Sequence, residues 1–166
     1  MYEKPNKYIY CNFVINICIS NNLIILVCNY NMATKEIISE IASRDAFFYL
    51  LKNNPGLIVL KLGAEWCGPC KQIKHIVHAF FATSPLDVVC GDIDVDQSFD
   101  FYSMLKSKKM VNGIPVMLCY KKGNVSFIPD DLVTGAEPTG LDNFFKRCGK
   151  HLQEVRINYP KSQIVK

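Results

Sequence analysis

The chain has 166 residues, of which 49% are hydrophobic, so it has room for one ordinary domain with a sizeable core and an appended segment. The net charge of +4 is scattered, with no run of Lys or Arg longer than two, which excludes a dedicated nucleic-acid surface. Eight cysteines are compatible with a disulfide-stapled secreted fold. The positions of three of these cysteines argue against such a fold. Cys90, Cys119 and Cys148 lie in apolar strand or helix patterns, where cysteine packs as a small hydrophobic residue.

Residues 1–31 form an extension whose composition differs from the rest of the chain. No charged residue occurs from Tyr8 to Thr34, a length that could span a membrane. Asparagines interrupt the stretch, however, and no small-x-small cleavage site follows its most apolar part. Three interpretations stay open: a leader or upstream translation before a start at Met32, a membrane anchor at residues 8–31, or a cleaved signal. We favour the first, which predicts a cytoplasmic protein. The other two predict a membrane-anchored or a secreted one.

The residues after this extension have the pattern of a compact domain, which we expect at residues 32–155. A short first strand is expected within residues 36–41, and Ser43 is a suitable N-cap for the helix that follows. The Asn-Asn-Pro-Gly sequence at residues 53–56 ends that helix. The apolar run at residues 57–62, interrupted by one lysine, then predicts a buried strand.

Two cysteines, Cys67 and Cys70, lie where this strand ends and the next helix begins. The first backbone N–H groups of a helix are unpaired and the helix dipole is positive there, so a thiolate is favoured over a thiol at Cys67. Cys70 lies one turn further in and can close a disulfide with it. Gly68 permits a tight turn, and Pro69 lacks an N–H group that would be unpaired at this position in any case.

The five residues from Trp66 to Cys70, Trp-Cys-Gly-Pro-Cys, resemble the active-site motif of the thioredoxin family. The resemblance extends over about residues 35–153. It implies the thioredoxin fold, an α/β structure with a central mixed β-sheet flanked by helices. Strand and helix order alone would indicate only an α/β sandwich.

A structural zinc site is the alternative use of a Cys-x-x-Cys pair, but it needs a second pair of ligands. The nearby candidates are His75 and His78, which lie on the same predicted helix as Cys70. One rigid helix cannot place all four ligands tetrahedrally around a metal ion. We therefore expect no metal and interpret the two histidines as part of a solvated or partly packed helix face.

The elements that follow keep the order of the family. Residues 88–96 predict a third strand, and apolar residues from 99 to 105 predict a helix. The sequence Gly113-Ile114-Pro115, before an apolar strand, is the second point of resemblance. It implies a cis Ile114–Pro115 bond beside the cysteine pair. The alternative is a trans proline that simply opens the strand.

The C-terminal part is expected to contain a hairpin, a helix and a tail. A turn at residues 121–124 leads to an expected strand at residues 125–128. Gly135 and Ala136 precede the last helix. Residues 156–166 carry three basic and no acidic residues and are expected to form a solvated tail.

Two positions depart from the family pattern. Typical thioredoxins have a buried aspartate six residues before the first cysteine, where this chain has Lys61, and a lysine that approaches it, where this chain has Asp92. The exchange predicts a swapped ion pair between adjacent strands, although each side chain could instead reach solvent. If the pair forms, Lys61→Ala should cost about 3–5 kcal/mol by leaving Asp92 unpaired. A lysine near Cys70 would also stabilise the thiolate and make the protein less reducing than a typical thioredoxin.

The resemblance implies a thiol–disulfide oxidoreductase that serves electron transport and cell redox homeostasis, with Cys67 as nucleophile and Cys70 as resolving thiol. Gly68, Pro69, Lys61 and Asp92 would tune this site. The substrate groove would consist of Trp66, Gly113, Ile114, Pro115, Gly135 and Ala136.

No nucleotide or flavin motif is visible, so we expect no cofactor, and no nucleic acid as a partner. The expected partners are disulfide-containing proteins and a separate thioredoxin reductase or small-thiol electron donor. A membrane would be a partner only if residues 8–31 act as an anchor. Two alternatives remain. One is a thioredoxin-fold interaction or scaffold module without turnover, and the other is a membrane-tethered disulfide oxidase or isomerase.

Overall fold

The computed structural model describes residues 7–11, 15–20, 23–28 and 32–160, with side chains from residue 35 onward. The chain divides into two units, at residues 1–36 and 37–166. In the first unit, β1 pairs antiparallel with β4, and β2 and β3 form a separate antiparallel hairpin. The bounds of these strands are β1 (Lys7–Cys11), β2 (Ile15–Ser20), β3 (Leu23–Cys28) and β4 (Met32–Ile38). Within the described ranges, no helix has the length and apolar character needed to cross a membrane.

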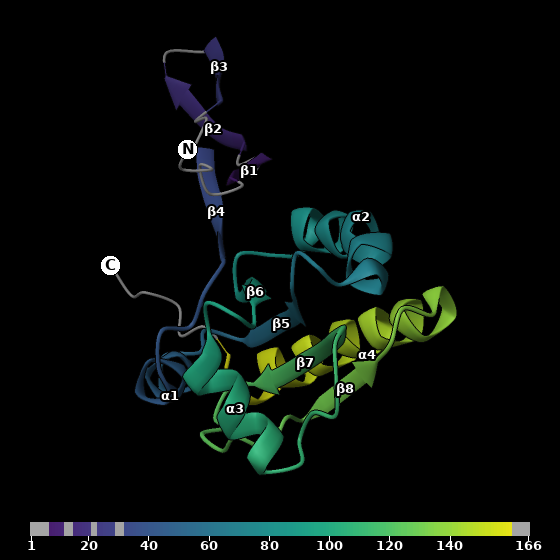
Figure 1. Cartoon of the computed structure of the whole chain (residues 1–166). Coiled ribbons are helices and arrows are strands. Elements are labelled where there is room, and N and C mark those ends of the chain that lie inside the picture. The colour runs from purple at the N-terminus through teal and green to yellow at the C-terminus, as the bar shows by residue number, and fades with distance from the viewer. Residues whose placement is uncertain (1–6, 12–14, 21–22, 29–31, 161–166) are drawn as a thin grey trace. The chain divides into compact units, whose positions relative to one another are not determined.

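The second unit is built on a mixed sheet with the strand order β4-β6-β5-β7-β8 (Figure 1). β6 runs parallel to both β5 and the last two residues of β4, Ile37 and Ile38. β7 and β8 complete the sheet with antiparallel pairings. The expected central mixed sheet is therefore confirmed. The bounds are β5 (Leu57–Gly63), β6 (Val88–Asp94), β7 (Val116–Lys121) and β8 (Asp131–Thr134).

The described residues also form four helices: α1 (Arg44–Lys52), α2 (Gly68–Thr83), α3 (Phe99–Ser107) and α4 (Pro138–Asn158). α1 begins where its sequence predicted, because the Ser43 side chain accepts a hydrogen bond from the backbone N–H of Ala46 at 3.1 Å. Glu137 caps α4 in the same way, through the N–H groups of Thr139 and Gly140. Each helix therefore starts at a residue that satisfies its first free donors, except α3, which has no side-chain cap.

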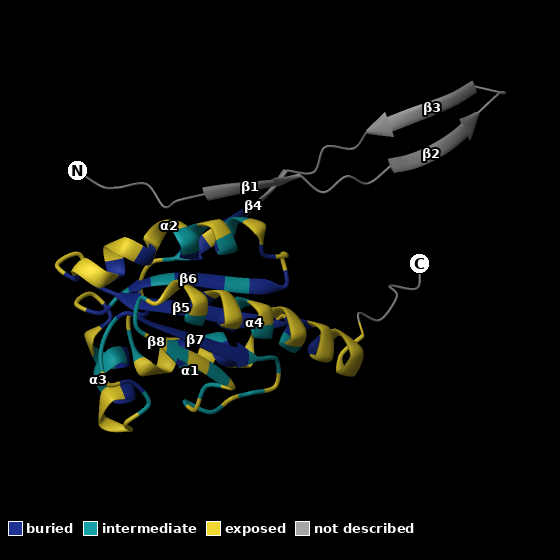
Figure 2. Cartoon of the chain, turned by 90° about the vertical axis from the view of Figure 1, so that its right-hand side faces the viewer, coloured by how far each residue is buried: buried dark blue, intermediate teal, exposed yellow. Residues whose placement is uncertain are grey.

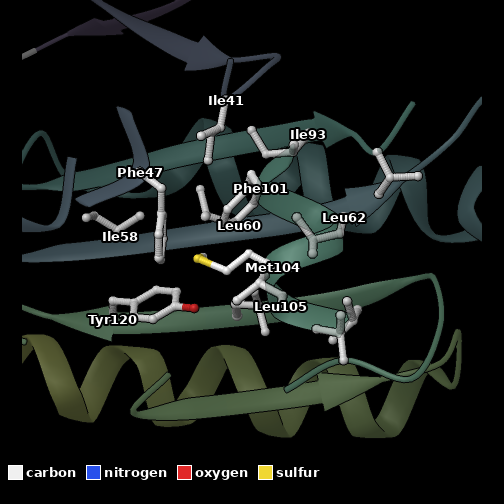
Figure 3. Close-up of a cluster of buried hydrophobic side chains, with 14 of the residues drawn as sticks. Ile41, Phe47, Ile58, Leu60, Leu62, Ile93, Phe101, Met104, Leu105 and Tyr120 are labelled. Carbon is white, nitrogen blue, oxygen red and sulfur yellow. The ribbon is translucent and has the colours of Figure 1, made fainter. Parts of the chain in front are cut away.

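One face of the sheet is covered by α1 and α3. Their rings Phe47 and Phe101 lie with centroids 4.6 Å apart, and Tyr120 of β7 meets Phe47 edge-on at 5.4 Å. Alternate side chains of β5, namely Ile58, Leu60 and Leu62, fill the same buried cluster (Figure 3). This cluster is the main core of the domain.

The opposite face of the sheet is covered by α2 and α4, which meet through the stacked rings of Phe80 and Phe145, 4.2 Å apart. Side chains alternate along a strand, so Lys61 points to this face while Leu60 and Leu62 point to the other. Figure 2 shows the central strands buried and the outer surfaces of the helices exposed. Lys61 is therefore enclosed between a sheet and a helix layer.

The prediction of a hairpin strand at residues 125–128 is wrong. The partner of β7 is β8, at Asp131–Thr134. Asn124 accepts a hydrogen bond from the Ser126 N–H at 2.8 Å and donates one to the Ile128 carbonyl at 3.0 Å, while Tyr120 Oη donates to the Phe127 carbonyl at 3.2 Å. These side chains bind the backbone groups that a strand would have paired, so the segment forms a loop.

Two other boundaries differ from those expected. β6 ends at Asp94 because the Asp94 carboxylate accepts hydrogen bonds from the N–H groups of Asp96 and Gln97, which turns the chain. α4 continues to Asn158, and Arg156, expected in a solvated tail, donates two hydrogen bonds to Asp87 at 2.9 and 2.8 Å. The rest of the expected tail, residues 161–166, lies outside the described residues.

Candidate active site

The cysteine pair lies at the junction of β5 and α2, as its position in the sequence indicated. Cys67 is the N-cap of α2, and the structure contains a Cys67–Cys70 disulfide with an S–S distance of 2.07 Å. The backbone N–H of Cys70 donates to Cys67 Sγ at 3.2 Å. Both cysteines are buried. A donor group of the first helical turn is therefore directed at the sulfur that would carry negative charge as a thiolate.

Trp66 precedes the pair and is 69% exposed, although tryptophan is usually well buried. Its indole Nε1 donates a hydrogen bond to Asp96 Oδ2 at 2.7 Å. Asp96 lies in the turn after β6, so this bond ties the active-site loop to the neighbouring loop. The tryptophan is held in place by one polar contact while most of its ring surface remains available for contact with another molecule.

The proline expected to be cis is confirmed as cis, at the bond between Ile114 and Pro115. Val116 pairs with Leu62 of β5, so Pro115 lies at the same end of the sheet as the cysteine loop. The backbone N–H of Gly135 donates to the Pro115 carbonyl at 2.9 Å, and Gly135 has φ of +97°, which favours glycine. Two segments expected to form the groove, residues 113–115 and 135–136, are thus brought together.

Ile114 belongs to the same surroundings as the cysteines. It is partly buried and packs against the core cluster that includes Cys67, Cys70 and Ala64. Gly113 and Ala136 are also partly exposed. The three segments named from the sequence as groove residues therefore lie at the same end of the sheet.

The two residues that depart from the family pattern are paired. Lys61 and Asp92 are register partners on the parallel strands β5 and β6, and Lys61 Nζ lies 2.7 Å from Asp92 Oδ1. Their side chains are only 8% and 19% exposed, respectively. The alternative in which each side chain reaches solvent alone is therefore wrong. A charged lysine at this depth is tolerable because a carboxylate accompanies it.

Lys61 also approaches Cys70. A Cβ atom placed on Gly63 would lie 2.7 Å from Lys61 Nζ and 3.3 Å from Cys70 Sγ. The ammonium and the sulfur are thus within about 6 Å of each other, the range in which one charge changes the ionisation of another group. A side chain at position 63 would therefore displace the end of the Lys61 side chain.

His78 is a site residue that the sequence reasoning missed. Its Nε2 lies 2.8 Å from Asp92 Oδ2, and its side chain is 16% exposed, whereas His75 is exposed. Burial alone would raise the pKa of Asp92, but hydrogen bonds from His78 and Lys61 lower the pKa below its usual value. The available signal was spacing: a residue eight positions after Cys70 returns to the same side of the helix.

A cavity of about 490 Å³ opens beside these groups and is lined by Lys61, Cys70 and Asp92, among others. It gives solvent a route to the buried charges and to Cys70. Over the part of the chain that the structure describes, no cluster of three or more His, Cys, Asp or Glu side chains could hold a metal ion. What the arrangement offers is a disulfide with a charged network beneath it.

Three further cysteines, among the residues whose side chains the structure describes, differ from this pair in their surroundings. Cys90, Cys119 and Cys148 are buried, as their apolar sequence surroundings predicted. A hydrogen bond with Cys148, together with burial, raises the pKa of the Cys119 thiol far above its ordinary value. A thiol in this state is a poor nucleophile.

Comparison with known proteins identifies the family. A sequence model described as Thioredoxin matches residues 39–147. The thioredoxin of Callithrix jacchus is 36% identical over 87 residues, covering 52% of this chain and 78% of that protein. The thioredoxin of Coprinus comatus is 30% identical over 101 residues, covering 60% and 88%. The solved structure of Fasciola hepatica thioredoxin has a TM-score of 0.52 at 29% identity, covering 66% and 98%. With the mixed sheet and the Trp-Cys-Gly-Pro-Cys loop already described, these matches show that the chain belongs to the thioredoxin family.

Proposed function

We propose that the protein is a thiol–disulfide oxidoreductase that reduces or exchanges disulfides of protein substrates. The observation that carries this proposal is the Cys67–Cys70 disulfide at the start of α2, with the Cys70 N–H directed at Cys67 Sγ. Family membership supports the general activity. The exposed Trp66 ring beside the cysteine pair supports a protein chain as the substrate, because it offers a large apolar surface for contact with another molecule.

In the reducing direction, the reduced protein begins as a Cys67 thiolate and a Cys70 thiol. The thiolate attacks one sulfur of the substrate disulfide, forms a mixed disulfide and releases the first substrate thiolate, which takes up a proton. Cys70 then loses its proton and attacks Cys67 Sγ, which releases the second substrate thiol and forms the Cys67–Cys70 disulfide. Two electrons pass from the protein to the substrate.

Electrons for the next cycle would come from a separate thioredoxin reductase or from a small thiol. Run in reverse, the same steps oxidise or rearrange a substrate. Lys61 affects the direction of electron flow, because an ammonium within about 6 Å of Cys70 Sγ favours thiolate and hence the reduced form of the cysteine pair. We therefore infer a reduction potential less negative than the roughly −270 mV of thioredoxin.

The activity is tested by reduction of insulin disulfides in the presence of dithiothreitol, followed as turbidity. Wild-type protein should accelerate the reaction, Cys67→Ser should abolish the acceleration, and Cys70→Ser should accumulate a mixed disulfide. No acceleration by correctly folded wild-type protein would contradict the proposal. Partner capture that persists in Cys67→Ser, without turnover in the wild type, would instead identify an interaction module.

The tuning role of the ion pair is tested separately. The Cys67–Cys70 potential is measured by equilibration with glutathione, for the wild type and for the double variant Lys61→Asp with Asp92→Lys. The double variant restores the family arrangement of the two charges, so its potential should be lower than that of the wild type. Equal potentials would make the exchange a structural variation only.

A further inference from the structure

A single carboxylate in the active site is shared by two donors on different elements. Asp92 Oδ1 lies 2.7 Å from Lys61 Nζ of β5, and Asp92 Oδ2 lies 2.8 Å from His78 Nε2 of α2. The three side chains are 8%, 19% and 16% exposed for Lys61, Asp92 and His78, respectively. Bulk water therefore screens these interactions less than it would at the surface. A change in the hydrogen bond to one oxygen of the carboxylate therefore alters the interaction made by the other oxygen.

The geometry assigns the hydrogen on His78. Both contacts and the lowered pKa of Asp92 correspond to an ionised carboxylate, which can only accept hydrogen bonds. Nε2 of His78 must therefore carry a hydrogen and donate it, whether the ring is neutral or charged. His78 thus stabilises the negative charge of Asp92 through this hydrogen bond, whether the ring is neutral or charged.

The effect of this hydrogen bond reaches the resolving sulfur through Lys61. Asp92 neutralises part of the Lys61 charge, and the remainder acts on Cys70 Sγ, which lies within about 6 Å of Lys61 Nζ. A donor on the second carboxylate oxygen reduces this neutralisation. More of the ammonium charge is then left to stabilise a thiolate at Cys70.

We propose that His78 is a positioning residue of the redox site, which acts through Asp92 and Lys61 to favour the reduced form of the cysteine pair. The inference rests on the proposed redox function and extends it to a residue outside the cysteine loop. His78 does not contact the sulfur in this scheme. It orients Asp92 and limits how far that carboxylate neutralises Lys61.

The test compares two amides of different reach at position 78. The amide nitrogen of His78→Gln can take the place of Nε2, whereas the side chain of His78→Asn is too short to reach Asp92. His75→Asn is the matched control, because His75 is exposed on the same helix. The full chain is equilibrated with glutathione at neutral pH, and the oxidation state of Cys67 and Cys70 is read by alkylation and peptide mass spectrometry.

We expect His78→Asn to shift the equilibrium toward the disulfide by about tenfold, which is a potential lower by roughly 30 mV. His78→Gln should recover most of the wild-type value, and His75→Asn should retain it. The inference is overturned if His78→Asn matches the His75→Asn control or shifts toward the dithiol. It is equally overturned if the Gln and Asn variants shift alike, because a packing defect would not distinguish them.

If His78→Asn does not fold, His78→Leu takes its place in the same comparison with His78→Gln. Failure of the proposed function has a different signature. It would appear as absence of insulin reduction by the wild type, whatever the potential. Failure of this inference would appear as an unchanged potential in the His78 variants while the wild type reduces insulin.

Discussion

Lys61 Nζ and Asp92 Oδ1 meet at 2.7 Å across two parallel strands, in register beneath the active-site disulfide. Relative to the pattern of typical thioredoxins, the acid and the base have exchanged strands. A buried carboxylate under the second cysteine could accept its proton during resolution, whereas a charged ammonium cannot. The exchange therefore replaces a candidate proton acceptor by a charge that stabilises thiolate.

Lys61→Ala should destabilise the fold by about 1–3 kcal/mol, less than the cost expected from the sequence alone. The reason is that Asp92 keeps the hydrogen bond to His78 and remains 19% exposed, so it is not left as an isolated buried charge. Urea unfolding of the oxidised protein measures this. Lys150→Ala, at an exposed position of α4, is the control and should stay within about 0.5 kcal/mol of the wild type. An unchanged midpoint for Lys61→Ala would contradict the prediction.

Gly63→Ala and Gly149→Ala should change stability in opposite directions. A Cβ at Gly63 would lie 2.7 Å from Lys61 Nζ and 3.3 Å from Cys70 Sγ, which forces Lys61 away from Asp92, at a cost of about 1–3 kcal/mol. A Cβ at Gly149 meets no atom within 4 Å, and alanine in a helix is better than glycine by about 0.5–1 kcal/mol. Thermal unfolding compares the two variants. Equal shifts of the same sign would show that the crowding at Gly63 has no energetic consequence.

Alkylation rates should separate Cys67 from Cys119 and Cys148. In the reduced native protein, iodoacetamide should label Cys67 at least about tenfold faster than Cys119 or Cys148, because the reagent reacts with thiolate, which the N-terminus of α2 favours at Cys67. Cys119 and Cys148 are buried, and the pKa of the Cys119 thiol is raised by its hydrogen bond with Cys148 and by burial. Peptide mass spectrometry resolves the sites. In urea the difference should vanish, and comparable rates in the native state would count against the assignment.

The ion pair between Asp100 and Arg44 predicts how stability changes at low pH. A side-chain hydrogen bond from Arg44, supported by the Arg44 backbone N–H, lowers the pKa of Asp100 to about 2. A carboxylate with a lowered folded-state pKa stabilises the fold above its unfolded pKa of about 3.9, and this contribution is lost as the pH falls toward 2. NMR titration should find the low value in the wild type and a value nearer the ordinary one in Arg44→Gln. Coincident titration curves would rule out the Arg44 effect.

Much of the fold could be predicted because its signals are local. Ser43 is followed by a helix because its side chain can cap the first N–H groups, and the apolar run at β5 marks a strand buried on both faces. The prediction of a strand at residues 125–128 was wrong for an equally local reason, which composition does not reveal. Asn124 and Tyr120 bind the backbone between residues 126 and 128, so the strand begins only at Asp131.

The sequence by itself indicated the chemistry of the cysteine loop and the order of strands and helices, because these signals are local. Its departure from the thioredoxin pattern predicted a pair between Lys61 and Asp92, and the structure decided between that pair and two side chains that reach solvent separately. Only the tertiary structure decided which distant groups complete these elements. His78 meets Asp92 because α2 packs over β6 at one particular rotation, and Arg156 meets Asp87 across 69 positions of sequence. Such contacts depend on the position and rotation at which a helix packs on the sheet. The packing of the whole core sets that position, and no single sequence motif encodes it.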